Sequence, residues 1–112
     1  STSRGLGDVY KRQHIYNTTF GVDPAVETEF IDWLRAEFIP ESTADGEYFS
    51  TPELMRVVSS DPTVNSLALH MRARELDDID KWYADHGARL FDLIQKRWNG
   101  HVVFFSTTLT LI

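Results

Sequence analysis

Two stretches of this chain carry apolar residues at helical spacing, and strand-like segments surround both, which restricts the folds open to it. The first stretch follows Asp23 and Pro24, a pair that favours the start of a helix. The two apolar stripes are Val26, Phe30, Trp33, Leu34 and Phe38, and then Ile79, Trp82, Tyr83, His86, Leu90, Leu93, Ile94 and Trp98. We expect one helix that bends or restarts at Pro40 and ends near Gly46, and a second over 76–98.

The remaining segments are typical of strands. Residues 14–22 alternate aromatic or β-branched residues with small and polar ones, and residues 101–112 are rich in Val, Phe and Thr. Residues 53–59 and 64–73 are separated by a short polar connection, which favours an antiparallel hairpin. The predicted order is therefore β-α-β-β-α-β.

This order predicts an α+β protein with the ferredoxin-like fold, in which a four-stranded antiparallel sheet carries two helices on one face. The strands over 14–22 and 64–73 would lie in the centre. Alternation places Tyr16, Thr18, Phe20 and Val22, with Leu67, Leu69 and Met71, on the helix side.

The other face of the sheet would be open, because two helices cover only one face. Apolar runs at Val57-Val58 and over 102–105 nevertheless put apolar side chains on both faces. An exposed apolar face favours aggregation, so we expect it to be covered by a second copy, giving a homodimer packed sheet to sheet.

Residues 1–13 differ from the rest. Within STSRGLGDVYKRQ, the run DVYKRQ at 8–13 resembles the translated end of a transposon used to tag sequencing libraries. A natural polar arm is the alternative. We expect a foreign or disordered segment over 1–13 and a single domain over 14–112.

The composition of the chain argues against some classes of binding partner. The chain has 112 residues, a formal net charge of -6 and no cysteine. An acidic chain is a poor partner for nucleic acid, and no apolar run approaches the roughly 20 residues that span a bilayer. The absence of a secretory signal pattern makes a cytoplasmic protein the default expectation.

Several runs carry a family resemblance: IYNTTF at 15–20, FIDWLRAEFIPE at 30–41, LMRV at 54–57, MRA at 71–73 and ADHGARL at 84–90. Over residues 14–112 the chain resembles a small bacterial family of unknown function, DUF4286. It is similar in outline to the dimeric α+β barrel superfamily. That superfamily includes cofactor-independent monooxygenases, haem-degrading enzymes and stress-response proteins, and the resemblance implies a dimer of the same kind.

One polar cluster is expected to converge on the open face. Asn17 and Thr19 would lie beside His70 on the neighbouring central strand, and Arg56 and Arg72 could join them. Such a set could orient a polar ligand, and His70 could transfer a proton near neutral pH. Alternatively, these groups satisfy one another or a partner subunit at a buried interface.

Other candidates have simpler interpretations. Trp33, Trp82, Tyr83 and Trp98 could form an aromatic cage, but their helical spacing favours the core. His86 is expected to be a satisfied histidine at the edge of the core. The four histidines lack paired ligand spacing, so we predict neither a metal site nor a cofactor.

Two functions remain. The first is a dimeric module that binds a small molecule or a protein partner without catalysis. The alternative is a cofactor-independent monooxygenase or a haem-handling enzyme, which the superfamily outline alone suggests. An RNA-binding module would need stacking aromatics where Asn17, Thr19, Ala68 and His70 stand, which argues against it.

Overall fold

The computed structural model describes residues 13–58, 61 and 63–112. The strands are β1 (His14–Val22), β2 (Ser50–Arg56), β3 (Asn65–Ala73) and β4 (Val102–Thr110). The first helical segment comprises η1 (Pro24–Val26), α2 (Glu27–Trp33), η2 (Leu34–Phe38), α3 (Ile39–Ser42) and η3 (Ala44–Gly46). The second comprises α4 (Leu76–Trp82), η4 (Tyr83–Gly87) and α5 (Ala88–Arg97).

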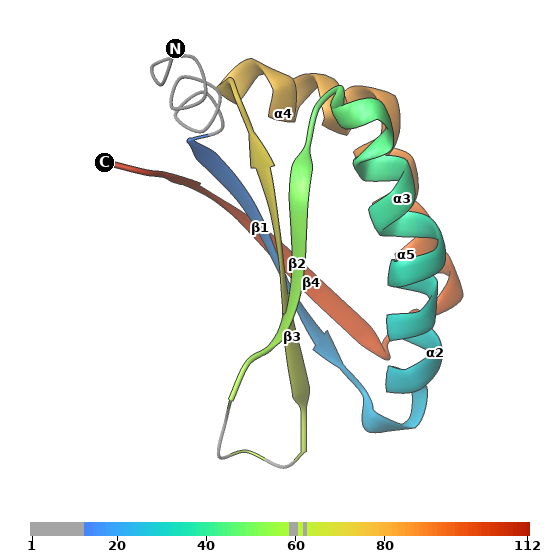
Figure 1. Ribbon diagram of the computed structural model, residues 1–112. Coiled ribbons are helices and arrows are strands. Elements are labelled where there is room, and N and C mark those ends of the chain that lie inside the picture. The colour runs from blue at the N-terminus through green and yellow to red at the C-terminus, as the bar shows by residue number, and fades with distance from the viewer. Residues whose placement is uncertain (1–12, 59–60, 62) are drawn as a thin grey trace.

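The strands form one antiparallel sheet in the order β2-β3-β1-β4, with both helical segments on one side of it (Figure 1). This is the predicted ferredoxin-like arrangement, and β1 and β3 are the central strands. The prediction that residues 1–13 are foreign concerns 1–12, which lie outside the described residues, and Gln13. The carbonyl of Gln13 accepts a hydrogen bond from the backbone N–H of Leu111 at 2.8 Å.

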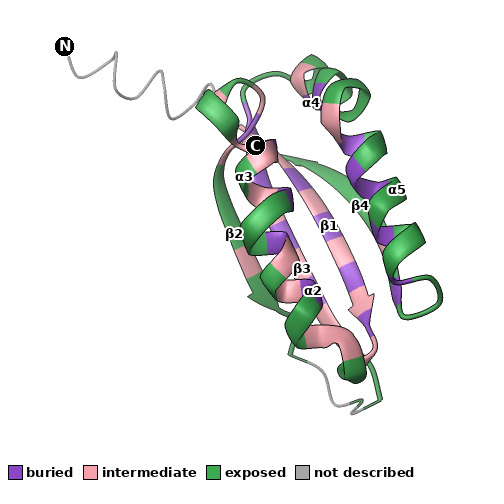
Figure 2. Ribbon diagram, turned by 90° about the vertical axis from the view of Figure 1, so that its right-hand side faces the viewer, coloured by how far each residue is buried: buried purple, intermediate pink, exposed green. Residues whose placement is uncertain are grey.

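The core fills the space between the helices and the sheet. Figure 2 shows buried positions alternating along β1 and β3, as expected where one face of a strand packs against helices. The predicted helix-side residues of both strands, from Tyr16 to Val22 and from Leu67 to Met71, are all buried. The helices contribute Phe30, Leu34, Phe38, Trp82, Leu90, Ile94 and Trp98 to the same cluster.

Each helical segment contains a π-turn that the sequence analysis did not predict. In the first segment, the backbone N–H of Ile39 bonds to the carbonyl of Leu34, five residues back. Pro40 explains the widened turn, because a proline ring clashes with the carbonyl four residues before it and donates no hydrogen bond. The expected irregularity at Pro40 therefore begins before the proline, over 34–38.

The second π-turn changes which side chains reach the core. Over 83–87 the turn contains one extra residue, so that Gly87 is buried after Trp82 and the buried face of α5 includes Phe91. Two members of the predicted stripe, Tyr83 and Leu93, are exposed instead. A continuous 3.6-residue periodicity does not account for this shift.

The predicted bounds of the second strand were wrong. β2 begins at Ser50 and ends at Arg56, whereas we expected residues 53–59. Its pairing with β3 shifts register between Ser50 and Glu53, and Thr51 has a left-handed φ of 52°. Pro52 looks like a strand breaker in the sequence, but an edge strand with a bulge tolerates it.

Candidate functional site

The structure brings together four of the five residues predicted as a site. Asn17 and Thr19 on β1 share the open face with His70 and Arg72 on β3, and Asn17 lies directly opposite His70 in the strand register. All four side chains are partly buried. The predicted convergence on the open face therefore holds for this subset.

Arg56 does not belong to this cluster. It pairs with Leu67, whose side chain is in the core, so Arg56 also lies on the helix side of the sheet. There its guanidinium forms an ion pair with Glu27 of α2, and the same carboxylate accepts a hydrogen bond from Asn65. The shifted start of β2 changed the expected neighbours of Arg56, which instead ties the hairpin to the first helix.

A second candidate site, which the sequence analysis missed, lies between α5 and the edge strand β4. We call it the α5–β4 groove, a cavity of about 420 Å³. It is lined by Tyr16, Tyr83, Ala88, Phe91, Asp92, Gln95, Phe104, Phe105 and Ser106. Its volume falls within the range of small-molecule pockets, roughly 300–1,000 Å³.

Aromatic rings form much of the lining of the groove. Phe91 and Phe104 are stacked with ring centroids 4.7 Å apart, and Tyr83 lies next to Phe91 at 6.3 Å. Tyr83 is 48% exposed, so its ring is free to contact a ligand. The sequence analysis assigned Tyr83 to the core and overlooked Phe91, because the π-turn over 83–87 was not foreseen.

Three hydroxyl groups lie close together, and two of them belong to Tyr16 and Ser106, which line the groove. The side chains of Thr18 and Ser106 are hydrogen-bonded at 3.0 Å, and the Tyr16 phenol lies close enough to both hydroxyls for them to affect its pKa. Burial raises the pKa of Tyr16, an effect that the hydrogen bond with Ser106 partly offsets. The phenol therefore stays protonated at neutral pH, and it can donate a hydrogen bond to a ligand oxygen.

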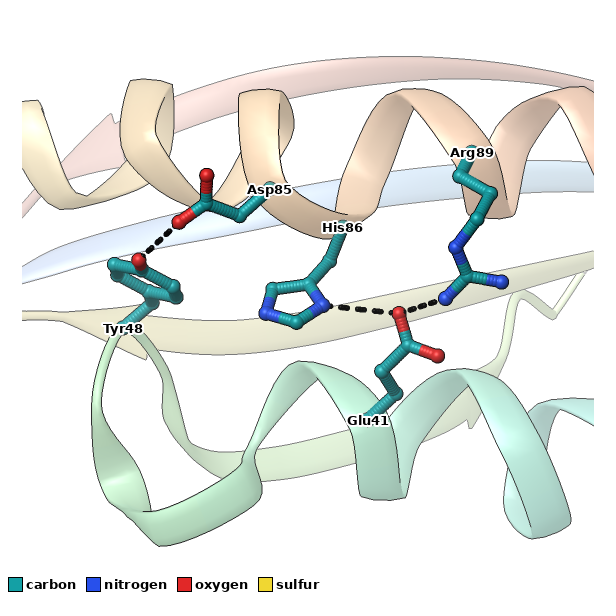
Figure 3. Close-up of polar contacts among 5 residues, drawn as sticks. All are labelled: Glu41, Tyr48, Asp85, His86 and Arg89. Carbon is teal, nitrogen blue, oxygen red and sulfur yellow. Dashed lines mark hydrogen bonds and ion pairs between the residues drawn. The ribbon is translucent and has the colours of Figure 1, made fainter.

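Figure 3 shows a separate polar cluster that joins the two helical segments. Glu41 accepts from Arg89 and from Nδ1 of His86, the latter at 3.0 Å, and Tyr48 donates to Asp85. Burial raises the pKa of Glu41, but the hydrogen bonds from Arg89 and His86 outweigh it and leave the pKa below its usual value. His86 is thus the satisfied boundary histidine that its position predicted.

The described residues contain no group of three or more His, Cys, Asp or Glu side chains that could hold a metal ion. His14 contacts Thr110 and His101 contacts Asp23, so each has its own separate partner. In the part of the chain that the structure describes, no helix is both long enough and apolar enough to cross a membrane.

Comparison with known proteins places the chain in a family. The family described as "Domain of unknown function (DUF4286)" matches residues 13–112, and the chain belongs to it. None of the curated proteins compared with the chain matches its sequence.

Solved structures share the fold at low sequence identity. A conserved protein from Methanosarcina mazei has a TM-score of 0.63 at 14% identity, with 94% of this chain and 99% of that chain covered. A monooxygenase from Streptomyces coelicolor, in complex with nanaomycin D, has a TM-score of 0.63 at 13% identity, covering 91% and 89%. A dabb family protein with a ferredoxin-like fold from Mesorhizobium loti has a TM-score of 0.55 at 15% identity, covering 89% and 99%. At these identities the likeness shows the fold alone.

Proposed function

We propose that this protein is a dimeric module that binds a flat, hydroxylated aromatic molecule in the α5–β4 groove. The observation that carries the proposal is that one cavity is lined both by stacked aromatic rings and by the hydroxyl-bearing side chains of Tyr16 and Ser106. The aromatic side chains favour an aromatic ligand that can stack on them. The hydroxyl groups fix the orientation of the ligand by hydrogen bonding.

The ligand oxygen is assigned to the Tyr16 end of the groove. Tyr16 is 8% exposed, and its phenol lies close to the hydroxyls of Ser106 and Thr18. A hydroxyl or carbonyl group on the ligand would form a hydrogen bond with this phenol. Tyr83, which is largely exposed, would cover the ring of the bound molecule.

The dimer is proposed to form through the open face of the sheet. Large apolar side chains are exposed on this face, including Met55, Val103, Phe105 and Leu109. A second copy would cover these side chains, because an exposed apolar face of this kind favours association. Light scattering coupled to size exclusion should give twice the 12.9 kDa of one chain. A monomer at micromolar concentration would contradict the dimer but not the groove.

Binding is tested with 1-naphthol and, as a probe without a hydroxyl group, naphthalene. Isothermal titration calorimetry of the intact chain should show that Tyr16→Phe weakens 1-naphthol about fivefold, the effect of one lost hydrogen bond, and leaves naphthalene unchanged. Tyr83→Ala should weaken both probes. Lys81→Ala, which removes an exposed side chain of α4 whose ion-pair partner Asp77 lies outside the lining of the groove, serves as the control.

The binding proposal is wrong if neither probe binds at millimolar concentration, or if Tyr16→Phe and Tyr83→Ala bind 1-naphthol as the unmodified protein does. Circular dichroism of each variant checks that the fold is intact.

A cofactor-independent monooxygenase is the second candidate. It is favoured by the S. coelicolor monooxygenase with nanaomycin D, which shares this fold, together with the phenol at the groove. Such an enzyme would convert 1-naphthol and O₂ to 1,4-naphthoquinone and water. Oxygen consumption above the rate in buffer would favour it, and binding without consumption favours the module. A shift in the absorbance of added haemin would instead indicate haem handling.

A further inference from the structure

A row of polar side chains crosses the open face through all four strands. The strand register places Glu53 of β2 opposite His70 of β3, His70 opposite Asn17 of β1, and Asn17 opposite Thr107 of β4. We call these four residues the polar row. Because paired residues of neighbouring strands share a face, all four side chains lie on the side without helices.

The side chains of the two central members of the polar row, Asn17 and His70, have hydrogen-bonding atoms that no described residue pairs. The Asn17 amide donates to the Thr19 hydroxyl at 3.2 Å, while its Oδ1 is buried and unpaired. Turning the amide over would only exchange the paired and unpaired atoms. The imidazole of His70, which is partly exposed, has no hydrogen-bond partner within 13–58, 61 and 63–112. A buried polar atom without a partner is unfavourable, so something outside one copy of the chain is expected to satisfy Asn17 Oδ1.

Apart from Thr19 and Arg72, the surroundings of the polar row are apolar. The neighbouring residues in the register on one side are Met55, Ala68, Thr19 and Phe105, and on the other side Ile15 and Leu109 lie beside Arg72. Phe105 is 62% exposed. A row of complementary polar groups inside an apolar surface is the pattern by which an interface selects one register over others.

We infer that the polar row is completed by a second copy of this chain, with His70 of each copy hydrogen-bonded to the Asn17 amide of the other. This inference rests on the proposed sheet-to-sheet dimer and adds its register.

The arrangement follows from symmetry. Consider a two-fold axis that lies between the two copies and runs parallel to the strands, midway between β1 and β3. The polar rows of the two copies then face each other and run in opposite directions. His70 then faces Asn17, and Glu53 faces the Thr107 hydroxyl, so each group meets a complementary one. An axis along the row would instead place Glu53 on Glu53 and His70 on His70, which like-charge repulsion disfavours.

Within the polar row, Asn17 and His70 are the residues whose positions sheet twist displaces least. Stacked sheets cross at about 30°, which displaces residues far from the axis more than residues beside it. Asn17 and His70 lie on the two strands that flank this axis. They are therefore the groups whose contact across the interface the twist preserves.

A mixing experiment distinguishes contacts between copies from contacts within one copy. One full-length chain carries Asn17→Ala and the other His70→Ala. Each variant homodimer has two broken pairs. A heterodimer of the two chains has one complete pair, because the first chain retains His70 and the second retains Asn17, while its other pair is absent altogether. Native mass spectrometry separates the three dimers by mass.

We expect the ratio of the heterodimer to each homodimer to exceed its statistical value of about two by about fivefold, the factor that corresponds to one net hydrogen bond, so that the heterodimer makes up roughly four-fifths of the dimers instead of about half. Chains carrying Lys81→Ala and Arg35→Ala, which differ in mass and change exposed positions of the two helical segments, should mix statistically. Circular dichroism confirms that all four variants fold.

Each outcome is informative. A statistical mixture of Asn17→Ala and His70→Ala chains, with the unmodified chain dimeric, overturns the pairing between copies and leaves the dimer in place. An unmodified chain that stays monomeric overturns the proposed dimer and the inference together. If a small ligand or another protein covers this face instead, the unmodified chain stays monomeric and forms no heterodimer with either variant.

Discussion

The α-carbon of Gly87 lies against the ring of Trp82, so that an added Cβ would stand 2.6 Å from the nearest ring carbon. This contact sits at the π-turn of the second helical segment, where Trp82 is fully buried. Any larger residue at position 87 must displace the indole or the turn. Because the same turn sets the position of Phe91, the contact also supports the α5–β4 groove.

Gly87→Ala is expected to destabilise the protein by about 1–3 kcal/mol, the usual effect of overpacking a core. Urea denaturation measures the free energy of unfolding. In a Trp82→Phe background, where the clashing ring is smaller, the same change should have a smaller effect. Equal losses in both backgrounds would show that the contact with Trp82 is not the cause.

Phe30→Ala should lower the free energy of unfolding by about 3–5 kcal/mol. Phe30 is fully buried and contacts the rings of Phe20 and Trp98, each at 5.1 Å between centroids. Leu93→Ala is the matched control, because Leu93 belongs to a predicted apolar stripe but is 40% exposed. Its loss should stay near 1 kcal/mol or below, and similar losses for both variants would contradict the observed burial.

Glu41→Gln should reduce stability at neutral pH, and the difference from the unmodified protein should disappear in acid. Since folding lowers the pKa of Glu41, the stabilisation by its carboxylate is present above the unfolded pKa and is lost as the pH falls through the folded pKa. At a partly exposed site the loss at pH 7 should be below about 1 kcal/mol. Urea denaturation from pH 3 to 7 measures it, and a difference that persists at pH 3 would rule out this ionic contribution.

Deleting residues 1–12 should change the free energy of unfolding by less than about 0.5 kcal/mol, because the segment adds no periodic apolar positions to the core. Deleting Gln13 as well removes the acceptor for the Leu111 N–H and should have a larger effect. Thermal and urea denaturation of both truncated chains test this. A clear loss on removing 1–12 alone would show that the segment is not foreign to the fold.

The parts of the fold that follow from local alternation could be predicted from the sequence. The bounds of β1 and the burial of Phe20 and Leu69 depend on a period of two, which the regular pairing of the central strands preserves. The convergence of Asn17 with His70 follows from the same alternation, once both strands are known to be central.

The α5–β4 groove and the position of Arg56 depend on a π-turn and a β-bulge, which a regular helical or strand periodicity does not predict. One extra residue in the π-turn exposes Tyr83 and buries Phe91, which together make the aromatic wall. The bulge near Thr51 moves the start of β2 and changes which residues oppose it. Gly87, which accommodates the Trp82 ring, is the sequence signal that could have indicated the first of these.

The two edges of the sheet differ in what they can accept. At β2, the left-handed Thr51 and the following Pro52 break the run of backbone groups that another strand would need, whereas β4 pairs with β1 without a shift from Val102 to Thr110. A chain that joins this sheet by backbone hydrogen bonds therefore has one good docking edge. Two copies joined through β4 would use up that edge on both, so neither copy could add a further strand to its own sheet.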